Sequence, residues 1–143
     1  YFTDVTFLSG TRIFNGWGAA VADMDGDGDL DILTGSRSGV RLFRNRGNAC
    51  HWLQVKVNNP GARVTVNQNG RSQIREIQVG SGTTSQDAMM AHFGLGTDST
   101  PVTVQVTLST GHEVERENIS VNQQIFCQVP GLTPNHQDAH EPR

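Results

Sequence analysis

Five aspartates stand at alternate positions in the stretch VADMDGDGDLDILTG, which runs from Val21 to Gly35. They are Asp23, Asp25, Asp27, Asp29 and Asp31. Carboxylates this close repel one another unless a cation lies among them. A hard cation such as Ca²⁺ takes about six to eight oxygen ligands, which a tight loop of alternate aspartates can supply. The stretch therefore predicts a calcium-binding loop rather than a solvated acidic turn.

The spacing also distinguishes between types of calcium loop. An EF-hand has a bidentate Glu at its twelfth position and lies between two helices. Counted from Asp23, the twelfth position is Thr34, and the flanking segments AAVADM and LDILTG resemble strands. The pattern is instead D-x-D-x-D-G-x-x-D, with Gly28 at the bend, so we expect the loop to connect two strands of a sheet. The predicted ligands are the side chains of Asp23, Asp25, Asp27 and Asp31 and the backbone carbonyl of Asp29.

Alternating apolar residues predict strands over most of the remaining chain. The segments that show this alternation are WLQVKV, ARVTV, IREIQV, VTVQVTL and QIFCQV. Turn signals such as NNPG, NQNG and the GLG at 94–96 separate them. Only the segment from Ser85 to Phe93 is expected to form a short turn of helix. The sequence therefore predicts an all-β protein.

Composition limits the possible partners. The 143 residues suit one compact domain or two small ones that share a core. Apolar runs are only a few residues long, which argues against a membrane span. The net charge is −3 and the 11 basic residues are scattered, which argues against nucleic acid as a partner. Because the numbering starts at Tyr1 with no initiating Met, we expect a processed product or a fragment.

The segment GWGAAVADMDGDGDLDILTGSRSGVRLFRNRGN resembles an FG-GAP/VCBS repeat, the calcium-bearing blade of integrin-type β-propellers. The later segments GARVTV, GRSQIREIQVGSGTTSQ, HFGLG, VTVQVTLSTG and NISVNQQI resemble, in family order, the ASPIC/UnbV domain that ends many secreted proteins. One departure is TLSTG, where that family often has a Trp-Pro pair before the turn. The resemblance implies a propeller-blade-like calcium-binding sheet (residues 1–49), packed with a small antiparallel β-sandwich or barrel (50–130) and followed by a polar tail (131–143).

A single blade cannot close a propeller ring. Its exposed face and edges must therefore be covered by the second domain, by another chain, or by further blades of a longer parent protein. We expect a neighbouring subunit to contact both the N-terminal segment YFTDVTFLSGTRIF, a candidate strand for exchange, and the tail 131–143. The alternative is that both ends pack on their own domain. The first possibility predicts a homo-oligomer or a filament.

Two cysteines and one sequon bear on the compartment. Cys50 opens the first strand of the second domain and Cys127 lies in its last strand, so a disulfide between them is expected, with two unrelated buried thiols as the alternative. Such a bridge fits an oxidising, calcium-rich exterior. Asn118 begins the tripeptide NIS, a glycosylation sequon.

No catalytic constellation is recognisable. The histidines are dispersed, the HQDAH at 136–140 has metal-binding spacing only if it is helical, and His92 within HFGLG is expected to be structural. The prediction is an extracellular, secreted, calcium-binding structural or adhesive module that is not an enzyme. One alternative is a calcium-dependent carbohydrate-recognition module, which requires exposed aromatic residues, whereas Trp17 is expected to be buried. The other is an accessory domain of an exported enzyme.

Overall fold

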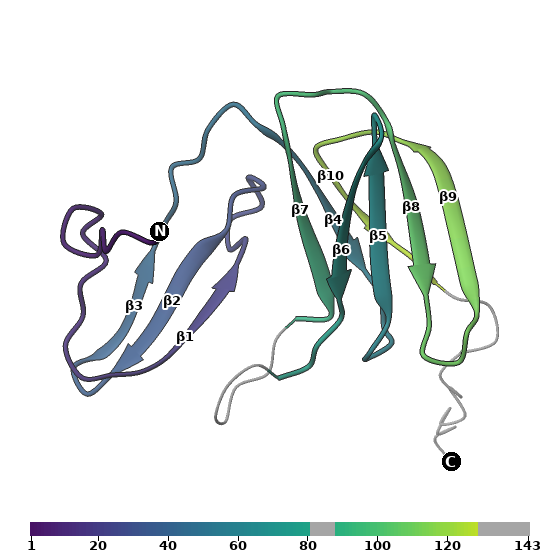
Figure 1. Ribbon diagram of the computed structural model, residues 1–143. Coiled ribbons are helices and arrows are strands. Elements are labelled where there is room, and N and C mark those ends of the chain that lie inside the picture. The colour runs from purple at the N-terminus through teal and green to yellow at the C-terminus, as the bar shows by residue number, and fades with distance from the viewer. Residues whose placement is uncertain (81–87, 129–143) are drawn as a thin grey trace, which may run out of the picture.

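A computed structural model describes residues 1–80 and 88–128 of the chain (Figure 1). These residues form ten β-strands and no helix, which confirms the all-β prediction. No helix in this part of the chain is therefore long and apolar enough to cross a membrane. The strands are β1 (Gly16–Ala22), β2 (Asp31–Ser36), β3 (Gly39–Phe43), β4 (His51–Lys56), β5 (Arg63–Gln68), β6 (Arg71–Glu76), β7 (Met90–Gly96), β8 (Val102–Thr107), β9 (Glu113–Ile119) and β10 (Gln123–Phe126).

The first sheet is an antiparallel meander in the order β1-β2-β3. Figure 1 shows it beside the remaining strands, with the connection between β1 and β2 at its upper end. The central strand β2 buries Asp31, Thr34 and Ser36, whereas most side chains of the edge strands β1 and β3 are exposed. The sheet has three strands, one fewer than the roughly four of a complete propeller blade.

The N-terminal segment does not form the strand that the sequence predicted. The Ser9 N–H donates to the Val5 carbonyl at 2.8 Å and the Gly10 N–H donates to the Phe7 carbonyl at 3.3 Å, so residues 5–10 form a local turn. Gly10 adopts a positive φ of 72°, which favours the turn over an extended strand. The predicted tail at 131–143 lies outside the described residues.

The other two sheets form a β-sandwich rather than a closed barrel. Their strand orders are β10-β4-β7 and β6-β5-β8-β9. Side chains from both sheets form one core between them, because apolar residues occupy alternate positions along β4, β5, β7 and β8. The core residues are Leu53, Val55, Val57, Ala62, Val64, Val66, Ile77, Ala91, Phe93, Leu95, Val102, Val104, Val106, Leu108 and Cys127. Burial of each larger side chain stabilises the sandwich by about 1.5–3 kcal/mol.

Two strands of the sandwich differ from the sequence-based expectation. The helical turn expected up to Phe93 is wrong for its described part, because Met90–Gly96 forms β7 and pairs antiparallel with β4. Ala91, Phe93 and Leu95 point alternately into the core, and the two glycines of GLG obscured this period of two. β9 was not predicted because its sequence EVERENI is mostly charged, which is typical of an exposed edge strand.

The expected disulfide is not formed, and the topology explains why. Cys50 and Cys127 are free thiols, the first exposed and the second buried. β10 runs parallel to β4, with Phe126 opposite Lys56, so Cys127 lies beside Val57. Cys50 precedes that position by seven residues, or about 23 Å along an extended strand. A disulfide requires Cα atoms within about 7 Å.

The two cysteines should therefore differ in reactivity. Burial raises the pKa of the Cys127 thiol, against a weaker opposing effect of Arg116, so at neutral pH Cys127 stays protonated. We expect iodoacetamide to alkylate Cys50 in the native protein and to reach Cys127 only after denaturation, as mass spectrometry of the labelled peptides can determine. Equal labelling of both thiols in the native state would contradict this packing of β10.

Candidate metal centre

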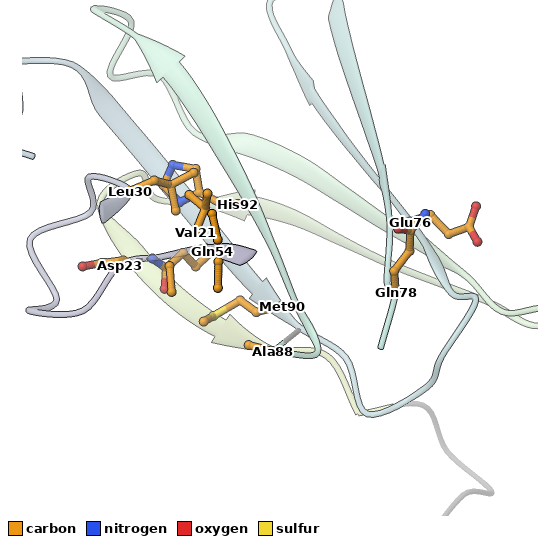
Figure 2. A pocket seen from close by; sticks show the side chains of 12 residues that line it. Val21, Asp23, Leu30, Gln54, Glu76, Gln78, Ala88, Met90 and His92 are labelled. Carbon is orange, nitrogen blue, oxygen red and sulfur yellow. Dashed lines mark hydrogen bonds between the residues drawn. The ribbon is translucent and has the colours of Figure 1, made fainter. Parts of the chain in front are cut away.

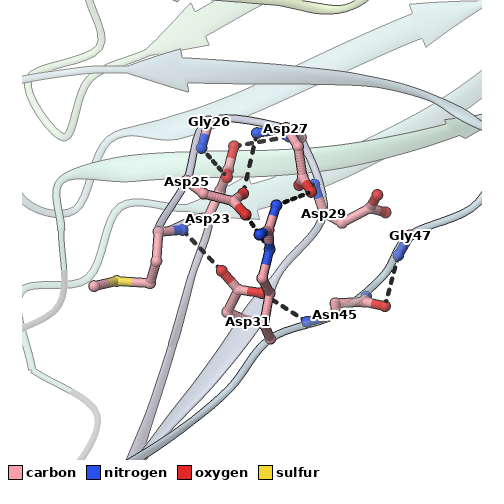
Figure 3. A network of polar contacts seen from close by, with 11 residues as sticks. Asp23, Asp25, Gly26, Asp27, Asp29, Asp31, Asn45 and Gly47 are labelled. Atoms are coloured by element: carbon pink, nitrogen blue, oxygen red, sulfur yellow. Dashed lines mark hydrogen bonds and ion pairs between the residues drawn. The ribbon is translucent and has the colours of Figure 1, made fainter.

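The loop of residues 23–30 connects β1 to β2, as the spacing of the aspartates predicted. Gly26 and Gly28 have positive φ values of 79° and 91°, a backbone conformation that glycine adopts without strain and that reverses the chain here. Asp23 accepts hydrogen bonds from both glycine N–H groups, at 2.8 Å from Gly26 and 3.0 Å from Gly28. The loop thus wraps around the carboxylate of its own first aspartate (Figure 3).

Three carboxylates converge at this loop. Asp23, Asp25 and Asp27 each offer one oxygen, and these oxygens all lie within 4.8 Å of one another. The Asp27 N–H donates to Asp25 at 3.4 Å, and the Asp29 N–H donates to Asp27 at 2.9 Å. Because the carboxylates are held by backbone donors on one side, their remaining oxygen lone pairs are available to a cation. The cluster could therefore hold a metal ion, and its all-oxygen chemistry suits a hard one.

A positively charged side chain already lies at this cluster. The Arg44 guanidinium, from the segment just after β3, pairs with Asp25 through Nε and lies 3.7 Å from Asp27 through its terminal nitrogen. Arg44 offsets part of the repulsion among the aspartates, and it occupies a position at which a cation is favourable.

The last two aspartates of the motif lie differently. Asp31 is only 1% exposed, and its two oxygens accept backbone hydrogen bonds from Met24 at 3.1 Å and from Asn45 at 2.7 Å. It thereby joins the start of the loop to the segment that follows β3. The Asp29 carboxylate points away from the cluster and packs against Gly47. The structure brings together Asp23, Asp25 and Asp27, and leaves the Asp29 and Asp31 carboxylates outside that group.

Sequence reasoning missed the residues that contact the loop from elsewhere in the chain. Gln54 of β4 donates from Nε2 to Asp23 Oδ2 at 2.8 Å, and the Trp52 indole packs against the backbone of Gly28. The only sequence signal for either residue is their position on β4, where they alternate with the core residues Leu53 and Val55. That alternation shows that they point away from the core without showing what they contact.

A cavity of 340 Å³ lies beside the loop, between β1 and the outward side of β4 and β7 (Figure 2). His92 lines it, and its Nδ1 atom is buried without a hydrogen-bond partner in the described part of the chain. Burial lowers the pKa of His92, and Arg75 lowers it further, although Asp23 and Asp29 act in the opposite direction. His92 is therefore neutral at pH 7.

The remaining predicted sites are dispersed. Asn118 is exposed on β9 with a positive φ of 57°, which leaves its glycosylation a prediction. Trp17 is 77% exposed, so its expected burial is wrong; it lies on β1, which is an edge strand of the first sheet in the described part of the chain. The HQDAH segment at 136–140 lies outside the described residues.

The fold and the loop together define an all-β protein in which a sheet with an acidic loop precedes a β-sandwich. The family described as ASPIC and UnbV matches residues 56–131, and the FG-GAP repeat matches residues 15–49. Since the first match covers more than half of the 143 residues, the chain belongs to the ASPIC and UnbV family, with an FG-GAP repeat ahead of that domain.

Two curated relatives are similar to most of the chain. Cartilage acidic protein 1 of Mus musculus and that of Homo sapiens are each 31% identical over 135 residues, which covers 86% of this chain and 20% of the relative. The chain thus spans about a fifth of the length of these relatives. No solved structure matches it.

The two outer aspartates should contribute differently to stability. Replacing Asp31 with Ala removes two hydrogen bonds to a buried carboxylate, so in the presence of a chelator we expect the free energy of unfolding to fall by about 3 kcal/mol. Asp29→Ala is the matched control, because no residue of the described ranges donates a hydrogen bond to its carboxylate, and it should change stability by less than about 0.5 kcal/mol. Urea denaturation followed by circular dichroism measures both, and equal losses would contradict the distinction.

Proposed function

We propose that this chain is an extracellular structural module that binds one Ca²⁺ ion at the loop between β1 and β2. The observation that carries the proposal is the convergence of the Asp23, Asp25 and Asp27 carboxylates. The Asp29 carbonyl and the Asp31 carboxylate are the further ligands we propose. The two Asp31 oxygens retain lone pairs beyond the two N–H groups they accept.

The donor chemistry favours calcium over other biological cations. Zinc prefers sulfur and nitrogen ligands, whereas this loop offers only oxygens. Magnesium requires a near-ideal octahedron and keeps several waters, whereas Ca²⁺ accepts many protein oxygens in flexible geometry. A loop with five aspartates in nine positions offers many protein oxygens and therefore matches the requirement of Ca²⁺ better than that of Mg²⁺.

Calcium would supply the charge that these carboxylates lack. With the ion bound, Arg44 is no longer needed to offset their repulsion, and the loop is held by ligands in addition to its hydrogen bonds. Binding that favours the folded state raises the free energy of unfolding. We therefore propose that the ion stabilises the first sheet, which has little buried surface of its own.

An extracellular, non-catalytic role is supported by the relatives and by the FG-GAP repeat. The relatives are named for cartilage and for their acidic character. Calcium modules outside the cell bind with dissociation constants of about 10⁻⁴–10⁻³ M, which a partly exposed loop can achieve. The acidic loop offers charged oxygen ligands rather than a nucleophile with a base, so we propose binding rather than catalysis.

The calcium ligands can be separated by mutation. We expect Asp25→Asn and Asp27→Asn each to weaken calcium binding by at least about ten-fold, because each removes a charged ligand. Asp29→Asn should leave the affinity within about two-fold, because its carbonyl is unchanged. Isothermal titration calorimetry measures these affinities, and loss of binding in Asp29→Asn with retention in Asp25→Asn would contradict the ligand set.

Arg44 provides an independent test of the same site. If its guanidinium competes with the ion for Asp25 and Asp27, Arg44→Gln should bind calcium several-fold more tightly than the unmodified chain. Arg41→Gln is the matched control, since Arg41 lies on β3 and forms no ion pair among the described residues. Weaker binding in Arg44→Gln alone would show that Arg44 supports the bound state instead.

We further propose that the module self-assembles into an oligomer or filament through its first sheet. Within residues 1–80 and 88–128, both edge strands of that sheet lack a further strand, and four apolar side chains on them are at least half exposed: Trp17, Val21, Val40 and Leu42. Exposed apolar residues and open strand edges are typical of surfaces that another chain covers. Each further copy of the chain can make the same contact through its first sheet, and repeated head-to-tail contacts either close into a ring or continue as a fibre.

Assembly should depend on this apolar surface and on calcium. In analytical ultracentrifugation with calcium, the full chain is expected to sediment as a concentration-dependent oligomer, and Val40→Lys with Leu42→Lys should give folded monomers. Ile74→Lys, an exposed apolar position on β6 of the sandwich, is the control and should assemble normally. A full chain that remains monomeric at high concentration would contradict the proposal.

The exposure of Trp17 also favours a second candidate, calcium-dependent recognition of an extracellular glycan, because sugar rings stack on exposed aromatic side chains. Binding of the monomer to a glycan array in calcium, lost in Trp17→Ala, would support this candidate. If the monomer binds no glycan on that array in the presence of calcium, the glycan candidate is contradicted.

A further inference from the structure

Strand β4 has two different faces. Leu53 and Val55 are fully buried in the sandwich core. The alternate residues Trp52 and Gln54 point to the other side, toward the loop between β1 and β2 (Figure 2 shows Gln54 beside Asp23). One strand thus supports the core with one face and the acidic loop with the other.

The contact through Gln54 is polar and almost fully enclosed. Gln54 is 4% exposed, and its amide nitrogen donates to the Asp23 oxygen that also accepts from the Gly28 N–H. A buried amide requires a partner, and here the partner is one of the three converging carboxylates. The position of Asp23 is therefore set partly by the second domain.

The contact through Trp52 is steric. Gly28 is buried and any Cβ at this position would overlap the indole of Trp52, so the ring lies directly against the loop backbone. Only glycine combines this close approach with the positive φ of 91° found here. The backbone of the acidic loop at Gly28 therefore packs directly against the Trp52 ring.

These contacts connect two parts of the chain that are otherwise joined weakly. No strand of the first sheet pairs with a strand of the sandwich in the described residues. Apart from the local bond of the Cys50 N–H to the Asn48 side chain at the junction itself, the bond between Gln54 and Asp23 is the one side-chain hydrogen bond between residues 1–49 and residues 50–80 or 88–128. The acidic loop is the place where the first sheet rests on the sandwich.

We infer that Gln54 is a positioning residue for the calcium site, and that the loop with Trp52 and Gln54 forms a calcium-dependent joint between the two parts of the chain. The inference rests on the proposed calcium binding. An ion that orders the loop presents Asp23 and Gly28 in the arrangement that Gln54 and Trp52 contact. Because coupling between two equilibria is reciprocal, the sandwich must in turn raise the calcium affinity of the loop.

The first test measures calcium affinity in the full chain. Gln54→Met keeps the length of the side chain and removes its donor, so we expect calcium binding to weaken by about five-fold. Gln73→Met is the matched control, because Gln73 makes a comparable amide hydrogen bond, to the Gly94 carbonyl, away from the loop. Its calcium affinity should be unchanged.

The second test reports on the joint itself. In a Trp17→Phe background Trp52 is the single tryptophan. Calcium is expected to reduce the quenching of Trp52 fluorescence by acrylamide. This protection should be lost when Gln54→Met is added to the Trp17→Phe background, and retained when Gln73→Met is added instead. A merely structural effect of Gln54 would lower thermal stability without removing the response of Trp52 to calcium.

The outcomes separate the two proposals. If the unmodified chain binds calcium and Gln54→Met binds it equally with the same protection of Trp52, the joint is overturned and the calcium site remains. If the unmodified chain binds no calcium in the titration, the proposed function and the joint are both overturned.

Discussion

The structure around the acidic loop depends on one electrostatic constraint, the mutual repulsion of carboxylates held on a short turn. Asp23, Asp25 and Asp27 cannot converge without compensation. The loop supplies part of it through backbone N–H groups that the glycines make available, and Arg44 supplies positive charge. A divalent cation would complete this compensation, which is the physical basis of the proposed function.

A second requirement of the same carboxylates, hydrogen bonding where water is excluded, accounts for the contact between the loop and the sandwich. A carboxylate that approaches a buried surface needs a donor there, and Gln54 provides one for Asp23. Since Gln54 lies on the same strand as Leu53 and Val55, the core that orders β4 also orders the donor. Strand β4 therefore affects both the packing of the sandwich and the geometry of the acidic loop.

The first sheet contrasts with the sandwich in how its surface is covered. The sandwich encloses a continuous core, whereas β1 and β3 expose apolar side chains and unpaired edges. The chain spans about a fifth of the length of its curated relatives. A neighbouring copy and a neighbouring segment would satisfy the same physical need, the removal of apolar surface from water.

Local patterns in the sequence determined the all-β class, the core faces of β4, β5 and β8, and the placement of the acidic loop between two strands, because alternation and glycine spacing act over a few residues. Tertiary structure alone decided the parallel pairing of β10 with β4, which separates Cys50 from Cys127. It also decided that Arg44 and Gln54 meet the aspartates, and that β1 leaves Trp17 exposed. These features depend on which distant segments become neighbours, and that choice is set by the packing of the whole sandwich rather than by any local pattern.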